Sequence, residues 1–150
     1  MTKEVFLSLK GLQLENGEGA EALETITPAD YYRKKDSHYV IYEEMTEGFL
    51  EKTRNMLKFR DSGLEVTKKG LINVHMVFEE NKKNMTSYMT PYGNILIGID
   101  TESILLEENE KQIRLLVDYS LEANYQHLAD CKIELELWPR ENGIHVISEV

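Results

Sequence analysis

Apolar and polar residues alternate one by one along much of the chain. In the segment 113–121 every second side chain is apolar, and the same alternation returns in 133–137 and 95–99. Successive side chains of a β-strand point to opposite faces, so a period of two is typical of strands with one buried face. The sequence therefore predicts a protein built mainly from half-buried strands.

Short turn sequences separate these segments. Glycine, proline, asparagine, aspartate and lysine gather at 34–37, 61–63, 80–84 and 91–94. Tight turns of this kind join antiparallel neighbours, and a sheet made of them leaves exposed edges unless it closes on itself. We predict an all-β, antiparallel, up-and-down barrel of about eight principal strands, with a two-sheet sandwich as the alternative.

Helical signals are weak, so we expect at most one short helix. The best candidate, 20–32, is interrupted by Pro28, and 123–129 fits either a helical turn or a connection between strands. We expect the barrel domain to span residues 1–138. The tail at 139–150 carries a turn and a short alternating segment, and it either adds an edge strand or forms a loose terminus.

The charge balance excludes several kinds of partner. The formal net charge is −10, whereas affinity for a phosphate backbone depends on clustered lysine and arginine, so we expect neither nucleic acid nor an anionic membrane as a partner. No apolar stretch approaches the ~18 residues that a membrane-spanning helix needs, and the N-terminal residues lack a signal-cleavage pattern. The single Cys131 cannot form an intrachain disulfide. We therefore expect a cytoplasmic protein in which Cys131 is a buried structural thiol.

Residue types that bind metals are scattered. His38, His75, His127 and His145 form no zinc-binding motif with one another or with Cys131. The chain also lacks a glycine-rich phosphate loop, a nucleophile elbow and a dinucleotide-binding fingerprint. The sequence predicts no metal, no cofactor and no catalytic residue.

The order of several short motifs resembles that of a known family. The most specific motifs are YEE at 42–44 and YMTPYG at 88–93, which follow Gly11 at the end of the first expected strand. Over residues 4–138 the chain resembles the YwiB-like family of small bacterial proteins of unknown function. This resemblance implies a calycin-like (lipocalin-like) β-barrel, and it implies no particular activity. Where similar sequences carry an arginine this chain has Lys68, which cannot make the planar two-pronged contact of arginine with an anion.

Strand parity indicates which polar side chains face the interior. Lys68 continues the apolar face of its strand, and Glu44 lies on the same face as Tyr42. The predicted inward polar residues, which are also the candidate ligand-binding residues, are Tyr42, Glu44, Lys68, Tyr88, Thr90 and Tyr119. A lone charge facing an apolar interior is costly, so we predict that Glu44 and Lys68 form a partly buried ion pair. Glu43 faces the other way and cannot form a carboxylate pair with Glu44.

Three functions remain open. The inward tyrosines and the resemblance favour a non-enzymatic binder of a small, partly apolar molecule in or at the mouth of the barrel. The eight tyrosines also suit half-buried strands without any ligand, which leaves a protein-interaction or homo-oligomeric module, such as a homodimer with a solidly packed barrel, as the alternative. An enzyme of hydrolase type is ranked last of the three, because no spacing of acid and base residues in the sequence requires catalysis.

Overall fold

The chain forms one antiparallel sheet of ten strands. The computed structural model describes residues 3–12 and 24–140. The strands are β1 (Glu4–Lys10), β2 (Glu24–Lys34), β3 (Ser37–Met45), β4 (Lys52–Arg60), β5 (Gly63–Gly70), β6 (Val74–Glu79), β7 (Lys82–Thr90), β8 (Gly93–Glu108), β9 (Ile113–Ala123) and β10 (Gln126–Pro139). These two described ranges contain no helix, and most of the candidate helix at 20–32 is part of β2.

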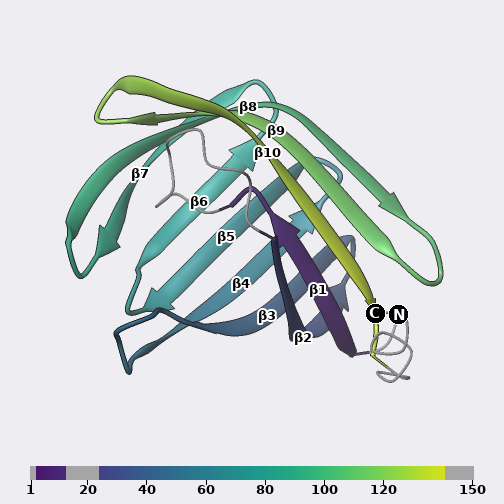
Figure 1. Ribbon diagram of the computed structural model, residues 1–150. Coiled ribbons are helices and arrows are strands. Elements are labelled where there is room, and N and C mark those ends of the chain that lie inside the picture. The colour runs from purple at the N-terminus through teal and green to yellow at the C-terminus, as the bar shows by residue number, and fades with distance from the viewer. Residues whose placement is uncertain (1–2, 13–23, 141–150) are drawn as a thin grey trace.

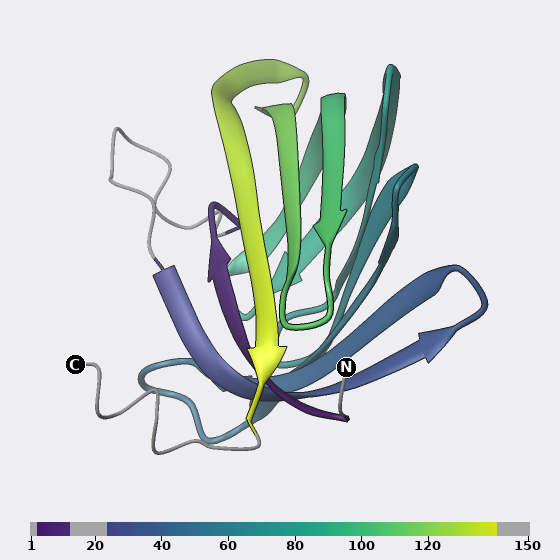
Figure 2. The same ribbon diagram turned by 90° about the vertical axis from the view of Figure 1, so that its right-hand side faces the viewer.

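The sheet curves round on itself. Its strand order is β6-β5-β4-β3-β2-β1-β10-β9-β8-β7, so almost every strand pairs with its neighbours in sequence while β1 also pairs with β10. Figure 1 shows β8, β9 and β10 crossing over β3 to β6, and Figure 2 shows the same wrapping from the side. The predicted antiparallel barrel is confirmed, and the single sheet excludes the sandwich. The count is ten rather than about eight because strands with little apolar alternation, such as β7, still pair through their backbones.

The barrel is nearly closed at the seam between β6 and β7. These strands are consecutive in sequence, yet they lie at opposite ends of the strand order and share no ladder. Two backbone hydrogen bonds join Asn73 to Met89 at one end of the seam, with N···O distances of 2.9 and 3.0 Å. Near the other end, the side-chain amide of Asn84 donates to the carbonyl of Val77 over 3.2 Å. These contacts satisfy part of the backbone that two unpaired edges would expose.

A packed apolar core fills the middle of the barrel. Every strand except β2 and β7 contributes inward aliphatic or aromatic side chains that are at most 1% exposed, among them Val5, Leu7, Val40, Leu57, Phe59, Leu64, Val66, Phe78, Ile99, Leu115, Val117, Ile133, Leu135 and Leu137. The strands β2 and β7 contribute Ala29, Tyr31 and Tyr88, each 5% exposed. Burial of one such large apolar side chain stabilises a fold by about 1.5–3 kcal/mol. The barrel is therefore solid in its middle, and any binding space lies toward an end.

The last described residues pair with the start of β1. Pro139 ends β10 opposite Val5, and the backbone N–H of Arg140 donates to the carbonyl of Glu4 over 3.1 Å. Residues 141–150 of the predicted tail lie outside the described residues. The part of the chain that the structure describes has no helix with the length and apolar character needed to cross a membrane.

Candidate functional site

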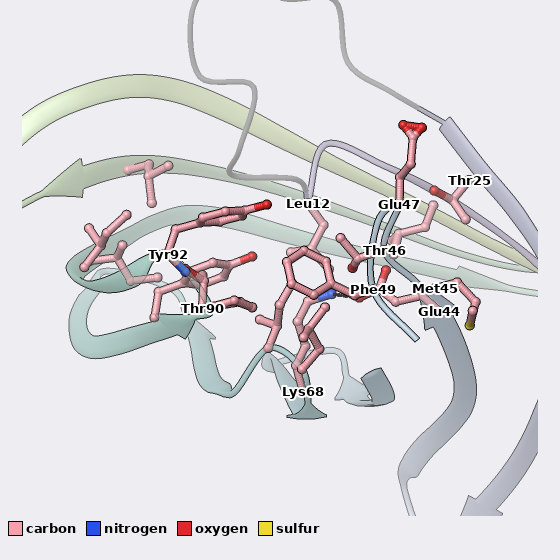
Figure 3. A pocket seen from close by; sticks show the side chains of 18 of the residues that line it. Leu12, Thr25, Glu44, Met45, Thr46, Glu47, Phe49, Lys68, Thr90 and Tyr92 are labelled. Carbon is pink, nitrogen blue, oxygen red and sulfur yellow. Dashed lines mark hydrogen bonds and ion pairs between the residues drawn. The ribbon is translucent and has the colours of Figure 1, made fainter. Parts of the chain in front are cut away.

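A cavity of about 500 Å³ lies at the end of the barrel where β3 and β7 end. The strand ends and the loops that follow them line it, as Figure 3 shows. Its walls are mainly apolar and come from Leu9, Leu12, Leu71, Ile72, Ile95, Ile97, Leu121 and Leu128. Pockets that bind small molecules are commonly apolar with a few polar groups, and this cavity has that composition.

Three neighbouring strands, β3, β4 and β5, bring a row of inward polar side chains together beside this cavity. The antiparallel register places Tyr42 of β3 opposite Asn55 of β4, and Asn55 opposite Lys68 of β5. Glu44 lies two residues beyond Tyr42 on the same face of β3. Side chains opposite one another on neighbouring strands lie within contact distance. The register therefore gathers an ammonium, an amide, a carboxylate and a phenol at one place.

The predicted ion pair between Glu44 and Lys68 is confirmed. The Nζ atom of Lys68 lies 2.8 Å from Oε1 of Glu44 and 2.8 Å from Oδ1 of Asn55. The Lys68 side chain is 9% exposed, whereas that of Glu44 is 31% exposed. Two charge-assisted hydrogen bonds compensate the removal of the ammonium from water. The adjacent Glu43 points outward and lies 3.7 Å from Lys52, so the two neighbouring glutamates serve separate surroundings.

Asn55 is the member of this cluster that strand parity alone did not single out. It is fully buried, accepts from Lys68, and donates from Nδ2 to the carbonyl of Thr53 over 3.4 Å. It shares a face with Leu57 and Phe59 in the alternation of β4. An asparagine among apolar inward positions is the sequence signal that could have identified it, because buried amides need partners.

Two tyrosines complete the inner surface of the cavity. Tyr42 and Tyr88 both line it and are each 5% exposed. Burial raises the pKa of the Tyr42 hydroxyl well above its usual range, and the nearby Glu44 carboxylate raises it further. Tyr42 is therefore a neutral phenol at any physiological pH, able to donate and to accept a hydrogen bond.

The other two predicted site residues, Thr90 and Tyr119, lie in different surroundings. Thr90 lines the cavity, but its hydroxyl donates to the carbonyl of Gly93 over 2.9 Å and accepts from the N–H of Tyr92. Both hydrogen bonds of this hydroxyl therefore stabilise the β7–β8 turn. Tyr119 faces the interior without lining the cavity. Its ring packs edge-on against Phe78, with centroids 5.0 Å apart, and its hydroxyl donates to the carbonyl of Gly11 over 3.0 Å. Tyr119 therefore faces the interior, as predicted, but it contributes to the packed core and not to the lining of this cavity.

The mouth of the cavity is bordered by two chain segments. Figure 3 shows Thr90 and Tyr92 on one side, Met45 and Thr46 on the other, and Phe49 between them. The rings of Phe49 and Tyr92 meet edge-to-face with centroids 5.9 Å apart. This contact links the β3–β4 loop to the β7–β8 turn across the mouth. The mouth therefore offers apolar surface as well as access.

Groups for acid–base or nucleophilic chemistry are few in this cavity. Its described lining contains two carboxylates, Glu44 and Glu47, and neither histidine nor cysteine. Cys131 is half-buried against the core, and burial raises the pKa of its thiol, which disfavours the nucleophilic thiolate. Among the described residues no cluster of histidine, cysteine, aspartate and glutamate is arranged to hold a metal ion.

A second buried polar cluster lies at the other end of β3. His38 is 1% exposed, and its Nδ1 lies 2.7 Å from the Tyr31 hydroxyl while its Nε2 lies 3.3 Å from Oε2 of Glu108. Arg33 contacts both carboxylate oxygens of Glu108 at 3.3 Å, and the imidazole stacks on Phe59. The neutral ring satisfies both contacts when Nε2 carries the hydrogen and Nδ1 accepts from the phenol. Neither Tyr31 nor His38 lines the cavity, so we interpret this cluster as a structural clasp between β2, β3 and β8.

Exchange of single members of the Glu44–Lys68 pair tests how strongly the two side chains depend on each other. We expect Glu44→Gln to destabilise the fold by about 1–2 kcal/mol, because it leaves a poorly compensated ammonium, and Lys68→Met to cost a similar amount. The double variant should lose less than the sum, with a coupling energy of about 1–2 kcal/mol in urea unfolding. Glu43→Gln is the matched control, with an expected change within about 0.5 kcal/mol. Strict additivity of the two single changes would contradict the pairing.

The His38 cluster predicts a pH-dependent stability. Burial lowers the pKa of His38 and is the largest effect on it. Glu108 raises this pKa and Arg33 lowers it, both to smaller extents. The unfolded chain, with a histidine pKa of about 6.5, then binds the proton more readily than the folded chain. The neutral His38 therefore contributes its full stabilisation to the folded state above the unfolded-chain pKa, and this contribution is lost as the pH falls below that value. We expect His38→Gln to lower the free energy of unfolding by about 1–2 kcal/mol at pH ~7.5, because hydrogen bonds of the imidazole are lost. The difference between the two proteins should shrink by pH ~5.5, because protonation then destabilises the wild type alone.

Chemical unfolding of both proteins across this pH range measures the effect. His75→Gln is the control, since that ring is more than half exposed. A difference between wild type and His38→Gln that stays constant with pH would contradict the assignment of a buried neutral imidazole.

Comparison with known proteins confirms the expected resemblance. The chain is similar to the protein in the crystal structure of YwiB from Bacillus subtilis, with a TM-score of 0.72, 18% sequence identity and coverage of 91% of each chain. At that identity the likeness shows the fold alone. No curated protein matches the chain. The sequence of residues 7–135 matches a family described as a domain of unknown function, DUF1934. This match covers most of the barrel, and the chain therefore belongs to the DUF1934 family.

Proposed function

We propose that this protein is a non-enzymatic binder of a small, partly apolar molecule, held in the cavity at the end of the barrel. The observation that supports it is the combination of about 500 Å³ of space, a mainly apolar wall and a small group of inward polar side chains. Binding sites for small molecules commonly have this size and composition. The solid middle of the barrel gives the cavity a rigid base, which lowers the entropic cost of binding.

The walls and the inner polar group have separate tasks in this proposal. The aliphatic side chains Leu9, Ile97 and Leu121 remove the apolar part of the ligand from water. Glu44, Lys68 and Tyr42 orient its polar part. The exposed apolar surface at the mouth, including Met45, shields the segment of the ligand nearest to solvent.

A cavity-filling substitution tests this proposal. Ala123 lines the cavity on β9, so a tryptophan at this position should occupy part of the space. We expect wild-type protein to bind the neutral dye Nile red with enhanced fluorescence, and Ala123→Trp to weaken that binding by about tenfold or more. Leu105→Trp is the control, because Leu105 is exposed on the outside of β8.

Two results would count against binding in the cavity. One is Nile red binding that Ala123→Trp leaves unchanged while circular dichroism shows a folded protein. The other is a wild-type protein that binds no dye and retains no small molecule in native mass spectrometry of freshly purified material.

A homodimer is the second candidate, because apolar side chains are exposed around the mouth. Leu50 in the β3–β4 loop is 96% exposed, Met45 at the end of β3 is 61% exposed, and Tyr92 in the β7–β8 turn is 87% exposed. In a two-fold dimer the same patch would meet itself and cover both cavities. We expect sedimentation velocity to show a concentration-dependent dimer that Leu50→Asp abolishes. A wild-type protein that stays monomeric at high concentration would contradict this candidate and leave the first one intact.

A further inference from the structure

The polar group inside the cavity has unused hydrogen-bonding capacity of both kinds. The Lys68 ammonium has three N–H donors, of which one goes to Glu44 and one to Asn55. Within residues 3–12 and 24–140 no acceptor takes the third donor. The second carboxylate oxygen of Glu44 likewise has no donor among these residues. Both side chains line the cavity, so a ligand finds one donor and one acceptor side by side.

The charges of these two side chains cancel each other. A carboxylate on a ligand that accepted from Lys68 would lie close to the Glu44 carboxylate, and an ammonium that donated to Glu44 would lie close to the Lys68 ammonium. In either case an ion would leave water to lie beside a pair without net charge, and this desolvation is unfavourable. Glu47 also lines the cavity, but Figure 3 shows its carboxylate directed away from Lys68. A neutral group pays a much smaller desolvation penalty and can satisfy both partners at once.

Tyr42 adds a third polar contact of the same neutral character. Its side chain belongs to a residue that is 5% exposed and lines the cavity, and its hydroxyl has no partner among the described residues. A phenol hydroxyl that no protein group pairs with can bond to water or to a ligand in the cavity. Tyr42 therefore points to the same kind of ligand group as the ion pair does.

We propose that the cavity selects molecules with a neutral head group that both accepts and donates a hydrogen bond, such as a primary amide or an alcohol, attached to an apolar tail. The inference rests on the proposed function above and specifies its ligand class. The head group accepts from the Lys68 ammonium and donates to the free oxygen of Glu44. The tail packs against the aliphatic wall toward Ile97 and Leu121.

A matched ligand series tests this selectivity. Decanamide, decanol, decanoate and decylamine share one tail and differ in head-group charge, with decanoate anionic and decylamine cationic near neutral pH. Their affinities are measured by displacement of Nile red at concentrations below micelle formation. We expect the amide and the alcohol to bind about tenfold or more tightly than either charged analogue.

Two charge variants should redirect the preference in opposite directions. Glu44→Gln leaves the Lys68 ammonium without its counter-charge and should shift the preference toward decanoate. Lys68→Met leaves the Glu44 carboxylate alone and should shift it toward decylamine. Glu43→Gln, on the outer face of the same strand, should keep the wild-type order of affinities. The wild-type series remains informative if either charge variant folds poorly.

The possible outcomes separate this inference from the proposed function. Tightest wild-type binding of decanoate or decylamine, or equal binding of all four molecules, would overturn the head-group inference and leave the binding function standing. Displacement of Nile red by none of the four would likewise overturn the head-group inference alone, whereas a wild-type protein that binds no dye and retains no small molecule would overturn both. A wild-type preference for neutral head groups that moves in opposite directions in the two charge variants would support both.

Discussion

The alternation of side chains along each strand, combined with the antiparallel register, is the constraint on which the rest of this structure depends. An inward position on one strand is opposite an inward position on the next, so residues far apart in sequence form rows across the barrel wall. The row of Tyr42, Asn55 and Lys68 is one of these. Because Lys68 occupies an inward position, its ammonium needs compensation inside the barrel. Glu44 and Asn55 supply that compensation, and the polar character of the cavity follows from it.

The two ends of β3 solve the same problem in different ways. Glu44 and His38 are both at inward positions, about 20 Å apart at the usual rise per residue. At the His38 end the imidazole fills the space, stacks on Phe59 and bridges Tyr31 to Glu108. At the Glu44 end the polar groups leave a cavity. Polar groups whose hydrogen bonds are all made with one another hold strands together, whereas polar groups with spare donors and acceptors can bind a ligand.

Strand parity predicts much of this arrangement. It identifies the inward faces of most strands, separates Glu43 from Glu44, and pairs Glu44 with Lys68. Parity is local, however, and it contains no information on depth along the barrel axis. For that reason Tyr119 and Tyr42 are equivalent in sequence, yet Tyr119 packs against Phe78 in the middle and Tyr42 lines the cavity. Asn55 and His38 are further cases, since their partners are set by the register between strands.

The sequence by itself determined the class of fold, the antiparallel connections and the side of the sheet that each residue faces. Those properties depend on period-two patterning and on turn residues, which act over a few neighbouring positions. Only the tertiary structure decided where the barrel is solid and where it is hollow, and which polar side chains keep unused hydrogen-bonding capacity. Both depend on how strands distant in sequence pack and on the exact register between them. A one-residue shift in that register would turn Lys68 or Glu44 to the outside and remove the polar group from the cavity.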